Sequence, residues 1–360
     1  MVKYYCRARE RFSRKASPFP ENEKEYRILS KKTKIILGIV LALVGIEWIK
    51  IIAVAVAAII VWTLIFTMTS TRITPTQQFT VMNYLGNASI SSRGNMFDVH
   101  YDSAFSNGVF SYEVLETTKV DLASNASMAG ELLSTRTATK EGDVIFVANA
   151  DDLDSEIKDE EGNVTGYGNT YLEEFARGYF SMLYEVDGYV QSMENYLKDY
   201  YKDGDWQDES KLNEELVKSE FRTRVKKDKR FKTKKQIAEG ETWEIERIKK
   251  YAKALDKFQG WLADGTVSYA DVVIKEADEN GQGEEKKTYA INLCPKTSST
   301  WTTDQEKKLS KLVSYKDKEG TAKLVEDMCV CLFHFDGVAD GFQYESMLYI
   351  VSVVEYALAA

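Results

Sequence analysis

Two apolar runs near the N-terminus limit what this chain can fold into more than any other feature. Residues 35–46 read IILGIVLALVGI and residues 51–68 read IIAVAVAAIIVWTLIFTM, with only EWIK between them. The second run has 18 residues, of which only Thr63 and Thr67 are polar. As a helix it would be about 27 Å long, close to the roughly 30 Å hydrocarbon core of a bilayer. We therefore predict that the chain spans a membrane, which makes the lipid bilayer its first expected partner.

The charged residues between the two runs set the expected position of the span. A charge at the bilayer centre costs at least about 2.5 kcal/mol, and Glu47 and Lys50 are spaced so that they can face each other on a helix. We predict a membrane segment over residues 35–68, with the main span at about 48–68 and Lys50 reaching the cytoplasmic surface. The upstream run would be embedded at the interface or covered by a membrane protein partner. The predicted anchor residues are Glu47, Trp48, Lys50 and Trp62.

Two other arrangements of the apolar runs stay open. In the first, a single continuous tilted helix buries the Glu47 and Lys50 pair, which a second helix would have to shield. In the second, the runs form a hairpin of two spans. The hairpin is disfavoured because the first run has only 12 residues and no turn residues separate the two runs.

The distribution of basic residues orients the span. Residues 1–34 carry eleven Lys or Arg and four Glu, a net charge of +7. Since the whole chain has a net charge of −9, the remaining residues carry −16. The positive-inside rule then places the N-terminus in the cytoplasm and the C-terminal part outside the cell. A cleaved signal peptide does not fit, because the apolar stretch begins late, is too long and lacks a cleavage pattern. The expected localisation is the cell membrane, as a single-pass protein.

Composition and motifs exclude several function classes. A net charge of −9 excludes a simple nucleic-acid binder, and 44% hydrophobic residues with only 4 Pro exclude a collagen-like or globally disordered chain. The sequence has no GxSxG, HExxH or Walker motif, and its two histidines are His100 and His334. Residues 155–158 match SxxK without the companion motifs of that enzyme family. We therefore predict a protein without catalytic residues and without a cofactor.

The cysteines indicate a fold that is held together by its core. Three of them, Cys294, Cys329 and Cys331, follow the membrane segment, and this odd, small number does not suit a disulfide scaffold. Cys329 and Cys331 with His334 could be read as metal ligands. Because MCVCLFHF alternates like a buried strand and no second ligand pair is visible, we predict core residues there and no metal site.

The segment after the membrane run carries strand and helix signals in alternation. Residues 78–86 and 108–120 have strand patterns, and residues 142–149 (GDVIFVAN) form a short apolar run typical of a buried parallel strand. Between the last two, Ser124 or Asn125 can cap a helix. This order is a βαβ unit, which predicts an α/β fold with a parallel sheet.

The rest of the chain continues with mixed elements. Residues 151–166 have the composition of an acidic solvated loop, and residues 218–235 hold ten Lys or Arg, typical of a solvated helix face or of a grip on an anionic partner such as phospholipid headgroups or a wall polymer. We expect helices at 170–183, 189–201, 243–262, 303–315 and 345–360, and strands at 266–275, 287–295 and 328–335.

This order of elements resembles the type II periplasmic solute-binding fold, as found in membrane-tethered extracellular proteins of Gram-positive-type envelopes. The stretches that carry the resemblance are EVLET, GDVIFVAN, YLEEFARGYFSML, TYAINLCP and the last strand and helix. It implies a transmembrane helix followed by a two-lobed α/β ectodomain. The implied layout is a basic tail (1–34), the membrane segment (35–68), a linker (69–77) and the ectodomain (78–360), with a charged helical insert at about 202–262.

Binding proteins of this kind hold a ligand at strand carboxyl ends and helix N-termini. The resemblance therefore implies Asn87, Ser124, Asn125, Asn149 and Asp151 as ligand-binding residues, although such residues also serve as helix caps and turns. The expected function is non-catalytic binding of a small polar solute or peptide at the cell surface. The alternative is a ligandless scaffold that holds a membrane complex, with a membrane protein partner bound through the transmembrane segment.

Overall fold

The chain forms two compact units, residues 1–72 and 73–360. The computed structural model describes residues 23–69, 75–84, 96–99, 108–122, 128–152, 155–275, 282–316, 322–323, 327–335 and 341–359. We refer to the second unit as the α/β unit.

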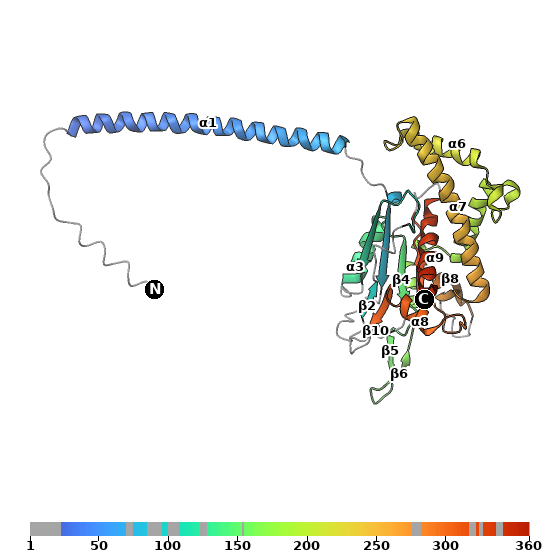
Figure 1. Ribbon diagram of the computed structural model, residues 1–360. Coiled ribbons are helices and arrows are strands. Elements are labelled where there is room, and N and C mark those ends of the chain that lie inside the picture. The colour runs from blue at the N-terminus through green and yellow to red at the C-terminus, as the bar shows by residue number, and fades with distance from the viewer. Residues whose placement is uncertain are drawn as a thin grey trace. The chain divides into compact units, whose positions relative to one another are not determined.

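The first unit is built on one long helix, α1 (Glu23–Thr69), drawn in blue in Figure 1. Its stretch Trp48–Thr67 is, within the described residues, the one helical segment long and apolar enough to cross a membrane, and none of it is buried. The hydroxyl of Thr63 donates to the carbonyl of Ile59 at 2.7 Å, so this polar group is satisfied inside the helix. Because α1 continues through residues 47–50 as one helix, the hairpin alternative is wrong.

A six-stranded mixed sheet forms the centre of the α/β unit, with the strand order β3-β1-β4-β11-β8-β7. The second strand in this order, β1, is parallel to both β3 and β4, whereas the pairs made by β11, β8 and β7 are antiparallel. The strands of this sheet are β1 (Gln78–Tyr84), β3 (Glu116–Asp121), β4 (Val144–Ala148), β7 (Ser268–Lys275), β8 (Glu285–Asn292) and β11 (Met328–Leu332). The predicted α/β class is confirmed as a mixed α/β fold.

The predicted βαβ unit is present as β3, α3 (Ala129–Ala138) and β4. Its two strands do not pair with each other, because β1 lies between them and pairs with both. The short apolar runs behave as expected for strands that are covered on both faces, since every residue of β4 and of β11 is buried.

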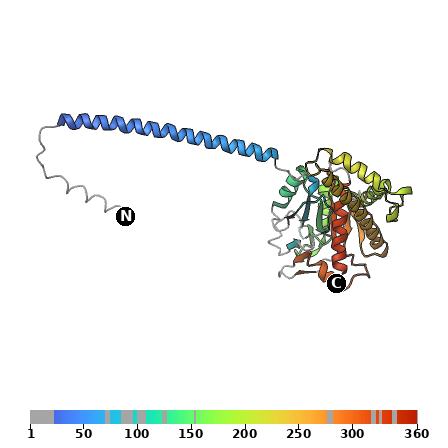
Figure 2. The same cartoon turned by 45° about the horizontal axis from the view of Figure 1, so that its top comes forward.

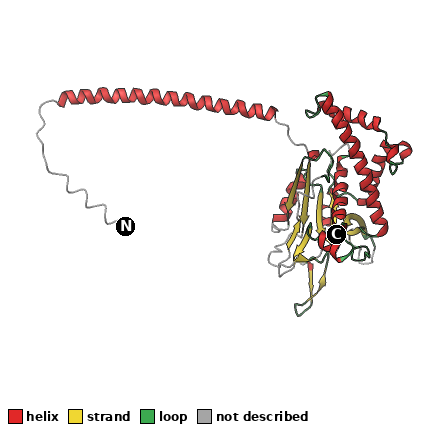
Figure 3. Ribbon diagram, in the orientation of Figure 1, coloured by secondary structure: helices red, strands yellow, loops and turns green. Residues whose placement is uncertain are grey.

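Helices cover the two faces of the sheet. Figures 1 and 2 show α3 on one side and the packed pair α7 and α9 on the other, and Figure 3 shows the strands between them. The helices of this unit are α3, α4 (Tyr171–Tyr179), α5 (Val186–Tyr200), α6 (Glu214–Arg224), α7 (Lys234–Asp264), α8 (Thr303–Leu309) and α9 (Glu345–Leu358). Single 3-10 turns lie at Pro75–Gln77, Phe180–Met182, Lys202–Gly204, Glu209–Lys211, Val225–Lys227 and Phe342–Tyr344.

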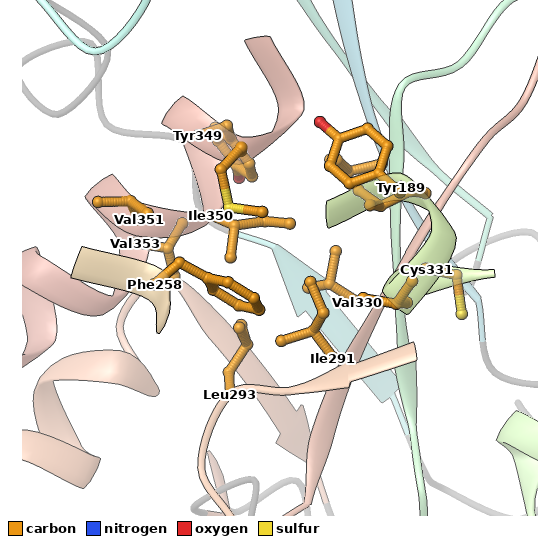
Figure 4. Packing of buried hydrophobic residues seen from close by; sticks show 14 of the residues in the cluster. Tyr189, Phe258, Ile291, Leu293, Val330, Cys331, Tyr349, Ile350, Val351 and Val353 are labelled. Atoms are coloured by element: carbon orange, nitrogen blue, oxygen red, sulfur yellow. The ribbon is translucent and has the colours of Figure 1, made fainter. Parts of the chain in front are cut away.

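One hydrophobic core joins the sheet to these helices. Figure 4 shows Phe258 of α7 and Ile350 of α9 beside Ile291 of β8 and Val330 of β11, all fully or almost fully buried. Residues 73–360 accordingly cluster as a single compact unit. The two lobes that the resemblance implied are not distinguished in it.

Local signals set the helix ends. Thr170 begins α4 and Thr233 begins α7, each with a capping box in which the threonine side chain accepts from the third helical amide. The cap at Thr233 lets α7 start nine residues before the predicted helix at 243–262. Helix α7 ends at Asp264, before Gly265, whose φ of 78° is the left-handed conformation that glycine adopts most readily.

Three predicted elements differ from the structure. The expected strand at 108–120 begins only at Glu116, and the acidic loop at 151–166 contains a two-stranded hairpin of β5 (Glu156–Lys158) and β6 (Val164–Tyr167). The expected helix at 303–315 stops at Leu309, because Val313–Lys316 forms β9, which pairs with β2 (Met96–Val99) and β10 (Ala322–Lys323).

Candidate functional site

The carboxyl ends of β1, β3 and β4 meet at one edge of the sheet, because these three strands are parallel. Asn83, near the end of β1, is buried and links this edge to β3. Its amide donates to Asp121 at 2.9 Å, and its carbonyl oxygen accepts from the backbone of Leu122 at 2.8 Å. Polar side chains of neighbouring strands therefore satisfy each other here.

The structure places Asn149 and Asp151 at the same edge, directly after β4. Asn149 is partly exposed, and its backbone N–H donates to the carbonyl of Asp327 at 3.1 Å. Asp151 is exposed and forms a backbone bridge with Thr170, the cap of α4. Both residues thus connect β4 to its surroundings through the backbone. Of the other predicted ligand residues, Asn87, Ser124 and Asn125 lie outside the described residues.

Two further polar groups of this edge were missed from the sequence. The hydroxyl of Tyr84 donates to the carboxylate of Glu174 at 2.6 Å, and burial together with this carboxylate raises the pKa of Tyr84. Asp152, next to Asp151, is buried. The only sequence signal for Tyr84 was its place at the end of a strand, because Glu174 lies 90 residues further along the chain.

A buried ionic cluster lies between α6, α7 and α9. At its centre is Glu244, which accepts from Arg224 at 2.7 and 2.8 Å and from Arg247 at 2.5 and 3.1 Å. Burial by itself raises the pKa of Glu244, but the two guanidinium groups outweigh burial and lower it to about 2. The side chain of Arg247 is fully buried and stacks on Phe342, with its guanidinium carbon 4.4 Å from the ring centroid.

The second half of the cluster is built around Glu345, the first residue of α9. Its carboxylate accepts from the backbone and the hydroxyl of Ser111 and from the hydroxyl of Tyr251 at 2.8 Å. Burial raises the pKa of Glu345. Since Ser111 belongs to the turn segment before β3, this cluster fixes that segment to the helices. We interpret the whole cluster as structural, because its groups satisfy one another away from solvent.

The basic segment at 218–235 divides into two kinds of side chain. Its arginines are paired with acidic residues of the unit: Arg222 with Glu241 at 2.6 Å, Arg224 with Glu244, and Arg230 with Asp228 at 2.7 Å and Glu113 at 3.0 Å. Its lysines from position 226 onward are all exposed. We call the following six residues the basic surface: Lys226, Lys227, Lys229, Lys232, Lys234 and Lys235.

Two open pockets flank Phe231 in this segment. The first has a volume of about 460 Å³, with an apolar floor of Val225, Phe231 and Ile237 and several lysines of the basic surface at its rim. The second has a volume of about 390 Å³ and lies against Leu115 and Trp243, which are 58% and 46% exposed. Neither pocket is lined by Asn149 or Asp151.

The remaining predicted residues have plain environments. Cys294, Cys329 and Cys331 are buried free thiols, and the ring of His334 packs on Tyr184 with 4.5 Å between the centroids. Across the described residues, no three His, Cys, Asp or Glu side chains are grouped so that they could hold a metal ion. Of the anchor residues, Trp48, Lys50 and Trp62 are exposed on α1, and Glu47 is described only as part of the helical backbone.

No family model, curated protein or solved structure matches this chain. A function can therefore be argued only from the geometry of its own residues.

Proposed function

We propose that this chain is a single-pass membrane-anchored protein whose α/β unit is a non-catalytic interaction domain presented outside the cell. The apolar stretch Trp48–Thr67 of α1 supports the anchor, since its 20 residues suit the thickness of a bilayer. The basic residues before the apolar part of α1 support an N-terminus in the cytoplasm. The α/β unit has its own sheet and core, which suits a domain that is tethered through a short connection.

The observation that carries the interaction role is the contrast between arginines and lysines at 222–235. The arginines are paired with acidic residues of the same unit, and these pairs join α6 and the following loop to α7 and to the turn at 111–113. The six lysines of the basic surface are exposed, and four of them, Lys226, Lys227, Lys229 and Lys232, line a pocket that also contains apolar side chains. Such a rigidly held cationic surface on a strongly acidic chain favours a role in binding an anionic partner.

Thiol labelling in cells tests the proposed topology. Cys6 precedes α1, whereas the cysteines of the α/β unit are buried. A membrane-impermeant maleimide should label Cys6 only after the cells are permeabilised. A cysteine introduced by Lys307→Cys on the exposed side of α8 should react in intact cells. Labelling of Cys6 in intact cells, with no labelling at position 307, would reverse the proposed orientation.

A second candidate function is binding of a small solute or peptide, as in proteins with the type II periplasmic fold and its two lobes. The polar edge with Asn83, Asp121, Asn149 and Asp151 favours it, because ligands of open α/β sheets bind at strand carboxyl ends. A thermal-shift screen of the detergent-solubilised chain against amino acids, peptides, sugars and nucleosides separates the two functions. A saturable shift would support solute binding, and an unchanged melting temperature across the screen would support the interaction domain.

A further inference from the structure

We propose that the basic surface, together with the exposed side chains of Leu115 and Trp243, binds the anionic lipid headgroups of the membrane that holds α1. This inference rests on the proposed membrane anchoring and names the partner of the interaction domain. The ligand chemistry is that of a lipid phosphate beside the upper part of an acyl chain.

The cationic and the apolar parts of this surface are held together by one aromatic cluster. The ring of Tyr112 lies 5.8 Å from that of Trp243 and 6.5 Å from that of Phe231, measured between centroids. Arg230, next to Phe231, pairs with Glu113, next to Tyr112. The loop that carries the lysines and the segment that carries Leu115 therefore form one end of the α/β unit, as Figure 1 shows for the top of α6 and α7.

The chain enters the α/β unit at this same end. The backbone N–H of Leu115 donates to the carbonyl of Gln77 at 2.8 Å, and β1 begins at Gln78. In the sequence, only residues 70–74 separate the end of α1 from Pro75, and five residues span at most about 18 Å when fully extended. A surface that binds the bilayer containing α1 must lie within reach of this connection, and Leu115 does so through its bond to Gln77.

The charge distribution favours this surface over the rest of the unit. Residues 35–360 carry a net charge of −16, so an anionic bilayer repels most of the molecule and attracts the six lysines. Of the acidic groups in this region, Asp228 is paired with Arg230, Glu241 is paired with Arg222, and Glu239 lies 3.9 Å from Lys235. The electrostatic attraction thus turns the basic end toward the lipid.

The mixture of residue types favours a lipid surface over a soluble polyanion. Tryptophan prefers the interface between headgroups and acyl chains, and lysine can extend its stem over apolar groups while its ammonium group reaches phosphate. A bilayer interface would cover Trp243 and Leu115, which are about half exposed and line a pocket that shares Phe231 with the lysine-lined pocket. A polyanion would satisfy the lysines and leave both apolar side chains in water.

Hydrogen exchange of the full chain in nanodiscs tests the inference. One nanodisc preparation contains phosphatidylcholine alone, and the other contains phosphatidylcholine with phosphatidylglycerol. We expect the amides of residues 225–237 and 112–117 to exchange several-fold more slowly in the anionic nanodiscs. Molar salt should abolish this protection because it screens surface charges, and α9 should exchange equally in both preparations.

Two matched variants make the result specific. The triple variant K226Q/K227Q/K232Q removes three charges from the basic surface and should lose most of the protection. The control K286Q/K307Q/K311Q removes three charges from exposed lysines of β8, α8 and the residues that follow α8, and should keep it. A third variant, Trp243→Ala, should weaken the protection without changing exchange in α9, which reports that the unit is folded.

Several results would overturn the inference. Equal exchange of residues 225–237 in neutral and anionic nanodiscs would mean that lipid charge does not matter. Protection by soluble polyphosphate but not by anionic nanodiscs would assign the surface to an anionic polymer. An equal loss of protection in the two triple variants would mean that only the net charge of the chain matters, and not the position of the lysines. Failure of the membrane topology itself would appear separately, in the labelling of Cys6.

Discussion

The substitution Glu244→Gln tests how much the buried ionic cluster contributes to stability. The Glu244 side chain is 3% exposed and accepts four hydrogen bonds from Arg224 and Arg247. A pKa lowered from 4.5 to about 2 corresponds to about 3 kcal/mol of stability at neutral pH. Leaving two buried guanidinium groups without their anion gives a similar figure, about 3–5 kcal/mol. We therefore expect Glu244→Gln to lower the free energy of unfolding by about 3 kcal/mol at pH 7.

The pH dependence of this loss follows from its sign. The folded pKa of Glu244 lies below the unfolded value, so its contribution is fully present above about pH 4.5 and disappears as the pH falls toward 2. The difference between the wild type and Glu244→Gln, measured by urea unfolding of the full chain in detergent with tryptophan fluorescence, should shrink over that range. The control Glu241→Gln breaks the pair with the exposed Arg222 and should cost less than about 1 kcal/mol. A loss for Glu244→Gln as small as that of the control, or one that does not change with pH, would refute this reasoning.

Two further predictions concern Asp143 and Gly240. Burial raises the pKa of Asp143 to about 7, although the N–H of Thr80 donates to its carboxylate at 2.7 Å. The wild type should therefore lose about 2–4 kcal/mol of stability as the pH rises from about 4 to 7. Asp143→Asn should lack this loss in the same unfolding assay, and a variant with the pH profile of the wild type would contradict the prediction. A Cβ at Gly240 would collide with the rings of Phe221 and Phe231, so Gly240→Ala should lower the melting temperature through a loss of about 1–3 kcal/mol. Gly260→Ala, in open space on the same helix, should raise it slightly, and equal shifts for both variants would refute the packing argument.

Local signals predicted the elements whose boundaries depend on neighbouring residues. The apolar runs VIFVA and MCVCL are buried strands, and the helix expected from position 170 begins at its threonine cap. The helix expected from position 243 begins at Lys234 instead, after a cap at Thr233 that was not predicted. The apolar stretch of α1 could also be identified from the sequence, because its length and composition do not depend on contacts with distant residues. In such segments the residues that form the sequence pattern also cause the structure, because they bury a strand on both faces or satisfy the end of a helix.

The failures came where distant residues decide the local conformation. The segment GVFSYEV alternates like a strand, yet Ser111 bonds to Glu345, 234 residues further along the chain, and this contact holds a turn instead. In the candidate site, Tyr84 and Glu174 are 90 residues apart and gave no joint signal. The two-lobed layout, which was inferred from the order of elements alone, is not confirmed, since residues 73–360 cluster as one compact unit.

The basic segment shows most clearly why charge alone could not define a site. From the sequence, its ten Lys and Arg form one run, and the run fits a solvated face as well as an anion-binding surface. The partners Glu113, Glu241 and Glu244 separate the two kinds of residue, because a planar guanidinium can bind carboxylates and stack on rings, whereas a strongly hydrated ammonium favours water. The arginines thus join α6 and the following loop to α7 and to Glu113, and the lysines from position 226 onward are exposed. A surface that is pre-organised in this way loses less entropy on binding than a flexible basic tail would.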